Sequence, residues 1–182
     1  LFSYTSYRHP EIRMPAPGDQ TAVEQELART YDHPSYDDPW EVVEDYQRVQ
    51  TYTARHPNNG SYAVARALDL PRSRVRPWLN GAMPDPMRAL DTCWTRNWLP
   101  DDWTSPRAVA WTVIMAAAWG GGSVSSDFFV PRWVVDDSDE RAILRGAADP
   151  LGLEFTELCE DPLEVGPTND GSVVGRLLVT LG

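Results

Sequence analysis

One segment in the first half of the chain limits the possible folds more than any other. Residues 61–80, SYAVARALDLPRSRVRPWLN, place apolar residues at helical spacing on both sides of a short break. A small residue, Ala65, lets two helices cross closely, and Asp69 tolerates the left-handed backbone that a tight turn needs. The segment therefore predicts two short helices packed across a turn. Leu70 is expected in the turn, and the inward positions of the two helices are expected to be Val64, Ala65, Leu68, Val75, Trp78 and Leu79.

This two-helix segment resembles the helix-turn-helix of bacterial and archaeal transcription factors. In that family the second helix enters the major groove of DNA and presents its outward side chains to bases and phosphates. With Val75 inward, helical spacing turns Ser73, Pro77 and Asn80 outward, with arginines beside them. The alternative is a solvated, arginine-rich helix that packs but binds nothing. As a DNA-binding unit, the segment is expected to use Arg66, Arg72, Ser73, Arg74, Arg76 and Asn80.

Pro77 conflicts with a regular second helix. Proline has no backbone N–H, and inside a helix it costs about 3 kcal/mol or produces a kink. We therefore expect this helix either to begin late, near Arg74, or to bend.

The charge of the whole chain argues at first against a nucleic-acid partner. Its 182 residues carry 16 basic and 27 acidic side chains, for a net charge of −11, and every basic residue is arginine. Phosphate binding favours a positive surface. Residues 48–107, however, contain nine Arg and five Asp, a local charge of +4, against −15 for the remainder. The lysine-free, acidic composition resembles that of extremely halophilic archaea, which leaves the basic segment as the part expected to meet DNA.

The remainder of the first half is expected to be helical and irregular. A capping box formed by Thr21 and Glu24 predicts a helix over 22–31 within an extension that covers residues 1–38. Asp38 followed by Pro39 predicts the start of a second helix, and another is expected over 86–97. The predicted domains are therefore 1–38, a helix-turn-helix domain over 39–104, and a further domain over 105–182.

The last domain is predicted to mix helices and strands in the order αββαββα. Ser105 and Pro106 predict the start of a helix that three glycines, 120–122, would end. The remaining elements are expected at 123–125, 128–135, 138–150, 155–159, 163–165 and 173–181. The fold class is thus α+β, with an all-α domain followed by an αββαββα domain.

This order, with the sequence IMAAAWGGGSV at 114–124, resembles the LAGLIDADG homing endonuclease fold. The similarity continues through the acidic run 136–140, the Leu-Gly-Leu at 151–153 and the final helix. It implies that the Ala/Gly-rich helix 105–119 pairs two copies in a homodimer; the alternative is a core helix with no pairing role. Family nucleases hold Mg²⁺ with a carboxylate at the end of this helix, where this chain has Gly121. The resemblance therefore implies a domain that does not cleave DNA, and we expect no catalytic residue, cofactor or metal.

The sequence as a whole predicts a sequence-specific, non-cleaving DNA-binding protein, a transcriptional regulator whose partner is double-stranded DNA. Two alternatives stay open: an active homing-type endonuclease that uses displaced carboxylates such as Asp127 or Asp136, and a protein-interaction adaptor with a vestigial helix-turn-helix. The two cysteines, Cys93 and Cys159, suit a reducing cytoplasm, and no apolar run is long enough to span a membrane.

Overall fold

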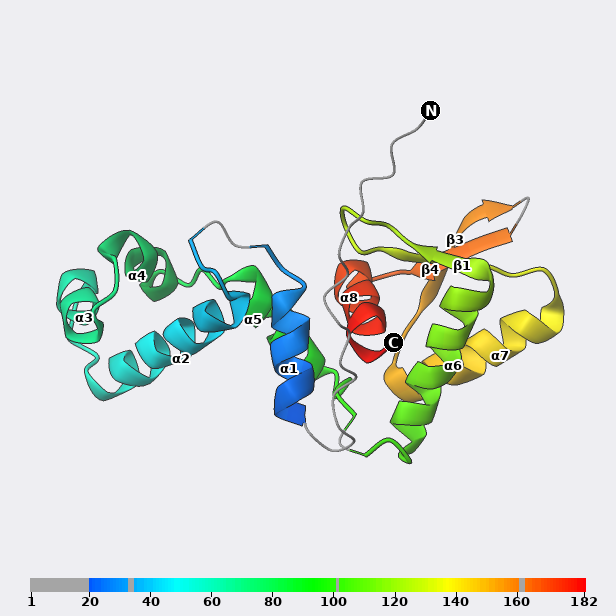
Figure 1. The fold of residues 1–182 in the computed structure, drawn as a ribbon, viewed down its shortest axis with the longest axis horizontal. Helices are drawn as coiled ribbons and strands as arrows, with labels where there is room; N and C mark the ends of the chain where they lie inside the picture. The colour runs from blue at the N-terminus through cyan, green and yellow to red at the C-terminus, as the bar shows by residue number, and fades with distance from the viewer. Residues whose placement is uncertain (1–19, 33–34, 101, 161–162) are drawn as a thin grey trace.

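The computed structural model describes residues 20–32, 35–100, 102–160 and 163–182. Within them the fold is α+β: eight α-helices and one four-stranded antiparallel sheet, with the first half of the chain entirely helical (Figure 1). Most of the predicted N-terminal extension, residues 1–19, lies outside the described residues. None of the helices described is both long enough and apolar enough to cross a lipid bilayer.

The helical half contains five helices. They are α1 (Gln20–Arg29), α2 (Pro39–Arg55), α3 (Ser61–Leu68), α4 (Arg72–Leu79) and α5 (Asp85–Thr95). The predicted capping box is wrong, because α1 begins at Gln20 and Thr21 therefore lies inside the helix. The predicted start of α2 is confirmed: the Asp38 side chain accepts a hydrogen bond from the Trp40 backbone N–H, and Pro39 is the first helical residue.

Helix α1 joins the two halves of the molecule. It packs against α2, α5 and the C-terminal helix α8 (Gly171–Leu181). Leu27 of α1 is completely buried, as are Leu90 and Cys93 of α5. Trp94, which the spacing of α5 places beside them, is instead 37% exposed, and its Nε1 donates to the Glu24 carboxylate at 2.8 Å. Trp94 therefore links α5 to α1 by a hydrogen bond at the protein surface.

The other half has the element order that the sequence predicts. It comprises α6 (Pro106–Gly121), β1 (Gly122–Val124), β2 (Pro131–Val134), α7 (Ser138–Ala148), the 3₁₀ turn η1 (Asp149–Leu151), β3 (Phe155–Glu160), β4 (Leu163–Pro167) and α8. The strands lie in the order β1-β2-β4-β3. Helix α6 does not stop at Trp119 as expected, but continues to Gly121. The next residue, Gly122, must lack a side chain, because a Cβ there would lie 2.5 Å from the Arg132 carbonyl oxygen.

One face of the sheet packs against helices. Trp133 and Val165, paired across β2 and β4, are buried there, and the Trp133 Nε1 donates to the Ile114 carbonyl of α6. The alternate residues of β2, Arg132 and Val134, point to the opposite face and are exposed. The α/β half is therefore a two-layer structure with an open sheet face (Figure 1).

Trp98 lies at the junction of the two halves. It is fully buried, and its Nε1 donates to the Leu151 carbonyl at 2.7 Å. Its own carbonyl accepts from the Trp111 Nε1 at 2.8 Å, and the two indoles pack edge to face with centroids 5.9 Å apart. Arg96 adds an ion pair to Asp170 at 2.6 Å. Buried residues of both halves consequently form one continuous core.

Candidate nucleic-acid interface

Helices α3 and α4 form the tight two-helix unit that the sequence predicts. Asp69 between them adopts the left-handed conformation, with φ of 56°, and the Leu70 N–H donates to the Ala65 carbonyl. Val64 and Val75 are completely buried between the helices. The two-helix unit packs against α2, where the Trp78 ring of α4 lies edge to face on the Tyr46 ring with centroids 5.6 Å apart.

The side of α4 that faces away from α2 is exposed. It carries Ser73, Arg76, Pro77 and Asn80, as expected from the inward positions of Val75 and Trp78. Of the two effects expected of Pro77, the late start near Arg74 is wrong, since α4 begins at Arg72, and the bend stays a prediction. Pro77 lies on the solvent side, where water can satisfy the Ser73 carbonyl that lacks its helical donor. The exposed side of the helix thus tolerates the proline.

Two further arginines of this helix pair are exposed. Arg72 is exposed at the start of α4, and its Nε donates to the Ser61 hydroxyl at 3.3 Å, which ties it to the start of α3. Arg66 is exposed on α3. We call the exposed set Arg66, Arg72, Ser73, Arg76, Pro77 and Asn80 the α4 surface.

Arg74 differs from the other predicted contact residues. Its guanidinium lies 4.1 Å from the centre of the Tyr36 ring and 3.7 Å from the Asp45 carboxylate, and its side chain is only 21% exposed. Asp45 also accepts from the Tyr36 hydroxyl and from Arg48, both at 2.8 Å. Burial and the Asp45 hydrogen bond raise the pKa of Tyr36 well above its ordinary value. Arg74 is therefore engaged with α2 and the segment before it, rather than presented on the α4 surface.

Sequence reasoning missed Tyr62. Its side chain is 68% exposed on α3, one turn before Arg66 and next to the Ser61 that Arg72 contacts. An exposed tyrosine hydroxyl beside arginines can donate to a phosphate oxygen. The available signal was its position opposite Val64 on the helical wheel.

The carboxylates considered for cleavage are not assembled into a metal site. Asp127 is exposed in the β1–β2 loop, where it accepts from Ser126. Asp137 caps α7 by accepting from the Asp139 and Glu140 N–H groups, both at 2.8 Å. Glu140 in turn accepts from the Asp136 N–H. Among the described residues, no group of three potential ligands is placed to hold a metal ion.

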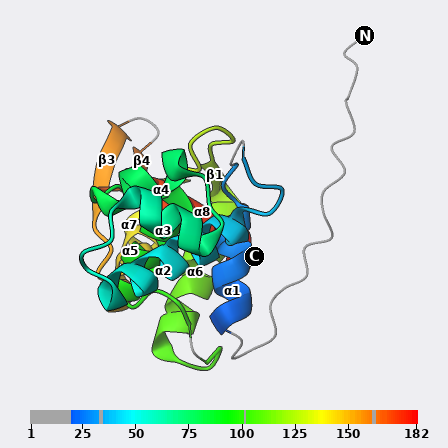
Figure 2. The same cartoon turned by 90° about the vertical axis from the view of Figure 1, so that its left-hand side faces the viewer.

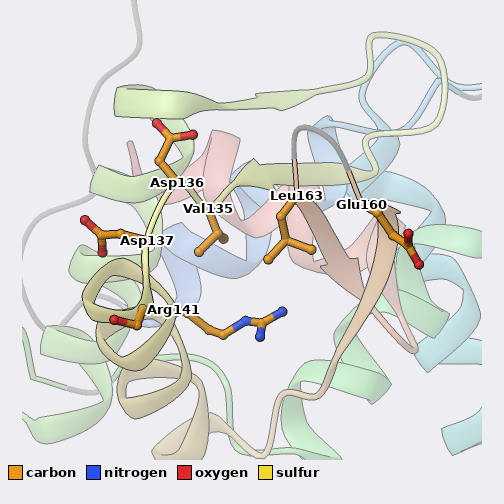
Figure 3. A pocket seen from close by; sticks show the side chains of 7 residues that line it. Val135, Asp136, Asp137, Arg141, Glu160 and Leu163 are labelled. Carbon is orange, nitrogen blue, oxygen red and sulfur yellow. The ribbon is translucent and has the colours of Figure 1, made fainter.

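A hollow of about 500 Å³ opens at the start of α7 (Figure 3). The Asp136, Asp137 and Glu160 carboxylates lie around it, and Arg141 projects toward it. Arg141, the one cation among the described residues that line the hollow, also pairs with Glu157 at 2.5 Å, which neutralises its charge. Three carboxylates repel phosphate, so this hollow does not suit a nucleic-acid backbone.

Helix α6 has one buried and one exposed apolar side. Trp111, Ile114 and Ala118 enter the core, whereas Val109 and Trp119 are 54% and 60% exposed. Thr112, Ala116 and Gly120 continue the exposed stripe. The stripe contains no charged residue, although residues 105–182 hold five Arg against twelve acidic residues. A helix that is apolar all around is ordinarily covered on both sides.

Comparisons of the chain with protein-family models, curated proteins and solved structures find no match. The structure itself defines an α+β protein with an exposed arginine-bearing helix pair at one end and an acidic two-layer half at the other (Figure 1).

Proposed function

We propose that this chain is a sequence-specific, non-cleaving DNA-binding protein that acts as a transcriptional regulator. The observation that carries the proposal is the α4 surface: an exposed helix face in which arginine, serine and asparagine side chains point away from the core. These are side chains that hydrogen-bond base edges in the major groove, with arginine suited to guanine and asparagine to adenine.

The position of the surface supports insertion into a groove. Helices α3 and α4 lie at the end of the molecule remote from the sheet, and Figure 2 shows them in front of the other helices. An α-helix with its side chains is about 10–12 Å in diameter, comparable to the width of the major groove. Segment 61–80 carries four Arg and one Asp, a local charge of +3 in a chain of net charge −11.

The resemblance of the αββαββα half to LAGLIDADG proteins supports a role without cleavage. Gly121 ends α6, where those nucleases hold their metal with a carboxylate. In this proposal the uncharged stripe on α6 pairs two copies of the chain, because acidic surfaces repel each other and an uncharged face avoids that repulsion. A symmetric pair would present two α4 surfaces to two half-sites.

The primary test is DNA selection in molar KCl, followed by affinity measurements on the selected site. We expect one preferred sequence, and the double variant Arg72→Ala/Arg76→Ala should lose at least tenfold in affinity, since each base contact is worth about 1–3 kcal/mol. Arg145→Ala, on α7 in the acidic half, is the matched control and should bind as the unaltered protein does. No sequence preference at any salt concentration would refute the proposal.

The absence of cleavage is tested with supercoiled plasmid and Mg²⁺. We expect no nicking above background. Nicking that disappears on substitution of Asp127 or Asp136 would instead identify an active endonuclease.

Pairing through α6 is tested by sedimentation. Trp119→Glu places a charge near the C-terminal end of the stripe and should convert a dimer into a monomer. Phe128→Glu, which changes an apolar residue of the β1–β2 loop that is 72% exposed, should leave the dimer intact. A monomeric unaltered protein at about 50 μM, a concentration at which interfaces of ordinary affinity are saturated, would contradict the pairing.

A further inference from the structure

Pro77 occupies the centre of the α4 surface, although the protein gains nothing evident from a proline there. Ser73 lies one turn before it and Asn80 three residues after it, so the three side chains share one exposed stripe. Ser73 and Asn80 can donate and accept hydrogen bonds. Pro77 is the one apolar member of the stripe.

The backbone effect of Pro77 is unfavourable in the free protein. The residue is the sixth of eight in α4 and removes the donor for the Ser73 carbonyl. Its ring is exposed, so burial of its apolar surface within this chain does not offset that loss. A local rule broken without compensation in the fold is expected where a residue serves binding.

From this placement we propose that Pro77 is a specificity-determining residue whose ring contacts the C5 methyl group of one thymine in the DNA half-site. The inference rests on the proposed DNA-binding function and goes beyond it by naming a base and the chemical group recognised. The thymine methyl is the apolar group that base pairs present in the major groove, and the groups beside it are hydrogen-bonding. A stripe with an apolar centre between two polar side chains complements that arrangement.

The size of the effect follows from the group that is buried. Burying one methyl group is worth about 0.8 kcal/mol, which corresponds to about a fourfold change in affinity. Because the methyl is uncharged, this contribution should be unaffected by ionic strength, unlike the contacts to phosphates.

The experiment replaces thymine by uracil, which removes only the methyl group. Each thymine of the selected site is replaced in turn, and affinity is measured for the unaltered protein, Pro77→Gln and Pro77→Ala in molar KCl. We expect one position per half-site at which uracil weakens binding by about fourfold. Pro77→Gln should bind the thymine and uracil sites equally, and Pro77→Ala, which keeps a small apolar side chain, should show a smaller ratio than the unaltered protein. Arg66→Ala serves as the control: it should weaken binding to both sites and leave their ratio unchanged.

The outcomes separate this inference from the function on which it rests. A preferred site that binds tightly but contains no thymine, or at which no uracil replacement weakens binding, overturns the role of Pro77 and leaves DNA binding in place. If Pro77→Gln, shown by circular dichroism to be folded, still binds the uracil site more weakly than the thymine site, the role of Pro77 is likewise overturned. If the unaltered protein prefers no sequence, the proposed function fails and this inference fails with it.

Discussion

The two halves of the molecule distribute their charge in opposite ways. In the helical half, α3 and α4 carry four arginines and no acidic residue, and among the described residues Arg74 alone of these four is ion-paired with a carboxylate. In the α/β half the carboxylates gather around α7 and the sheet, and α6 has an exposed side without charge. A net charge of −11 describes neither half. This comparison shows that a binding partner must be inferred from the charge of the surface that would contact it. The net charge of the whole chain is set mainly by residues outside that surface.

The two halves nevertheless share one continuous core, and the largest expected effect tests the contact between them. Trp98→Ala should cost about 3–5 kcal/mol, because it empties a completely buried site and leaves the Leu151 carbonyl without its donor. Chemical denaturation followed by circular dichroism measures the loss. Trp94→Ala, which alters a partly exposed indole on α5, should cost far less. Equal losses in the two variants would show that Trp98 does not form the junction.

Helix α8 gives a second test, confined to the acidic half. Gly175 allows α8 to approach the Phe129 backbone so closely that a Cβ would lie 1.7 Å from the Phe129 carbonyl oxygen. Gly175→Ala should therefore cost about 1–3 kcal/mol by overpacking. Gly146→Ala in α7 is the matched control: a Cβ there meets nothing within 4 Å, so the better helix former should stabilise by about 0.5–1 kcal/mol. Thermal unfolding of both variants measures the two changes in stability, which should have opposite signs. Stabilisation by Gly175→Ala would contradict the close approach of α8 to the Phe129 backbone.

How much of this the sequence predicts depends on whether the determining interactions are local. The turn at Asp69, the cap at Asp38 and the order αββαββα follow from neighbouring residues and are correctly predicted. Contacts across the fold are not predictable in this way. The engagement of Arg74 by Tyr36, and the place of Trp98 between the halves, depend on residues distant in sequence that only packing brings together.

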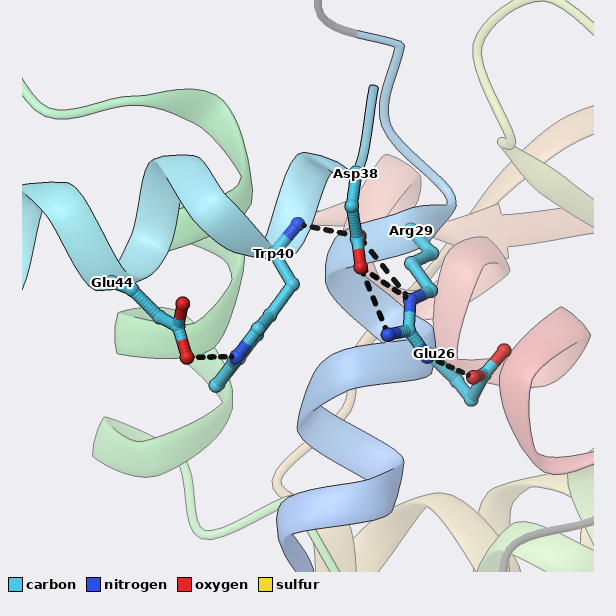
Figure 4. A network of polar contacts seen from close by, with 5 residues as sticks. All are labelled: Glu26, Arg29, Asp38, Trp40 and Glu44. Carbon is cyan, nitrogen blue, oxygen red and sulfur yellow. Dashed lines mark hydrogen bonds and ion pairs between the residues drawn. The ribbon is translucent and has the colours of Figure 1, made fainter. Parts of the chain in front are cut away.

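Asp38 offers a smaller and pH-dependent test within the helical half (Figure 4). It caps α2 and accepts from Arg29 at 3.0 Å, and this hydrogen bond lowers the pKa of Asp38 below its ordinary value of 3.8. A depressed pKa in the folded state means that the carboxylate contributes stability at neutral pH, and that this contribution is lost as the pH falls below about 4. Asp38→Ala should cost about 1 kcal/mol at pH 7.

Asp38→Asn separates the cap from the charge. Asparagine caps helices as well as aspartate does, so the variant should lose less stability than Asp38→Ala at pH 7. Its difference from the unaltered protein should shrink as the pH falls below about 4, because the stability that depends on the Asp38 charge is then progressively lost. Urea denaturation between pH 3 and 7 provides the measurement. A difference that stays constant over that range would show that the Arg29 pair contributes nothing.

The smallest expected effect distinguishes two arginines of the same helix. Arg74 stacks on Tyr36 and faces Asp45, so Arg74→Ala should lower stability by about 0.5–1 kcal/mol. Its effect on DNA affinity should be slight, since the guanidinium is held away from the α4 surface.

Arg76 is exposed, and no ion pair within the described part of the chain holds it, so Arg76→Ala should leave stability unchanged and weaken binding about tenfold or more. Urea denaturation and affinity measurements on the same two variants give both readouts. If Arg74→Ala weakens binding as strongly as Arg76→Ala, then Arg74 must leave Asp45 when DNA binds, and the contrast between a structural and a contacting arginine disappears.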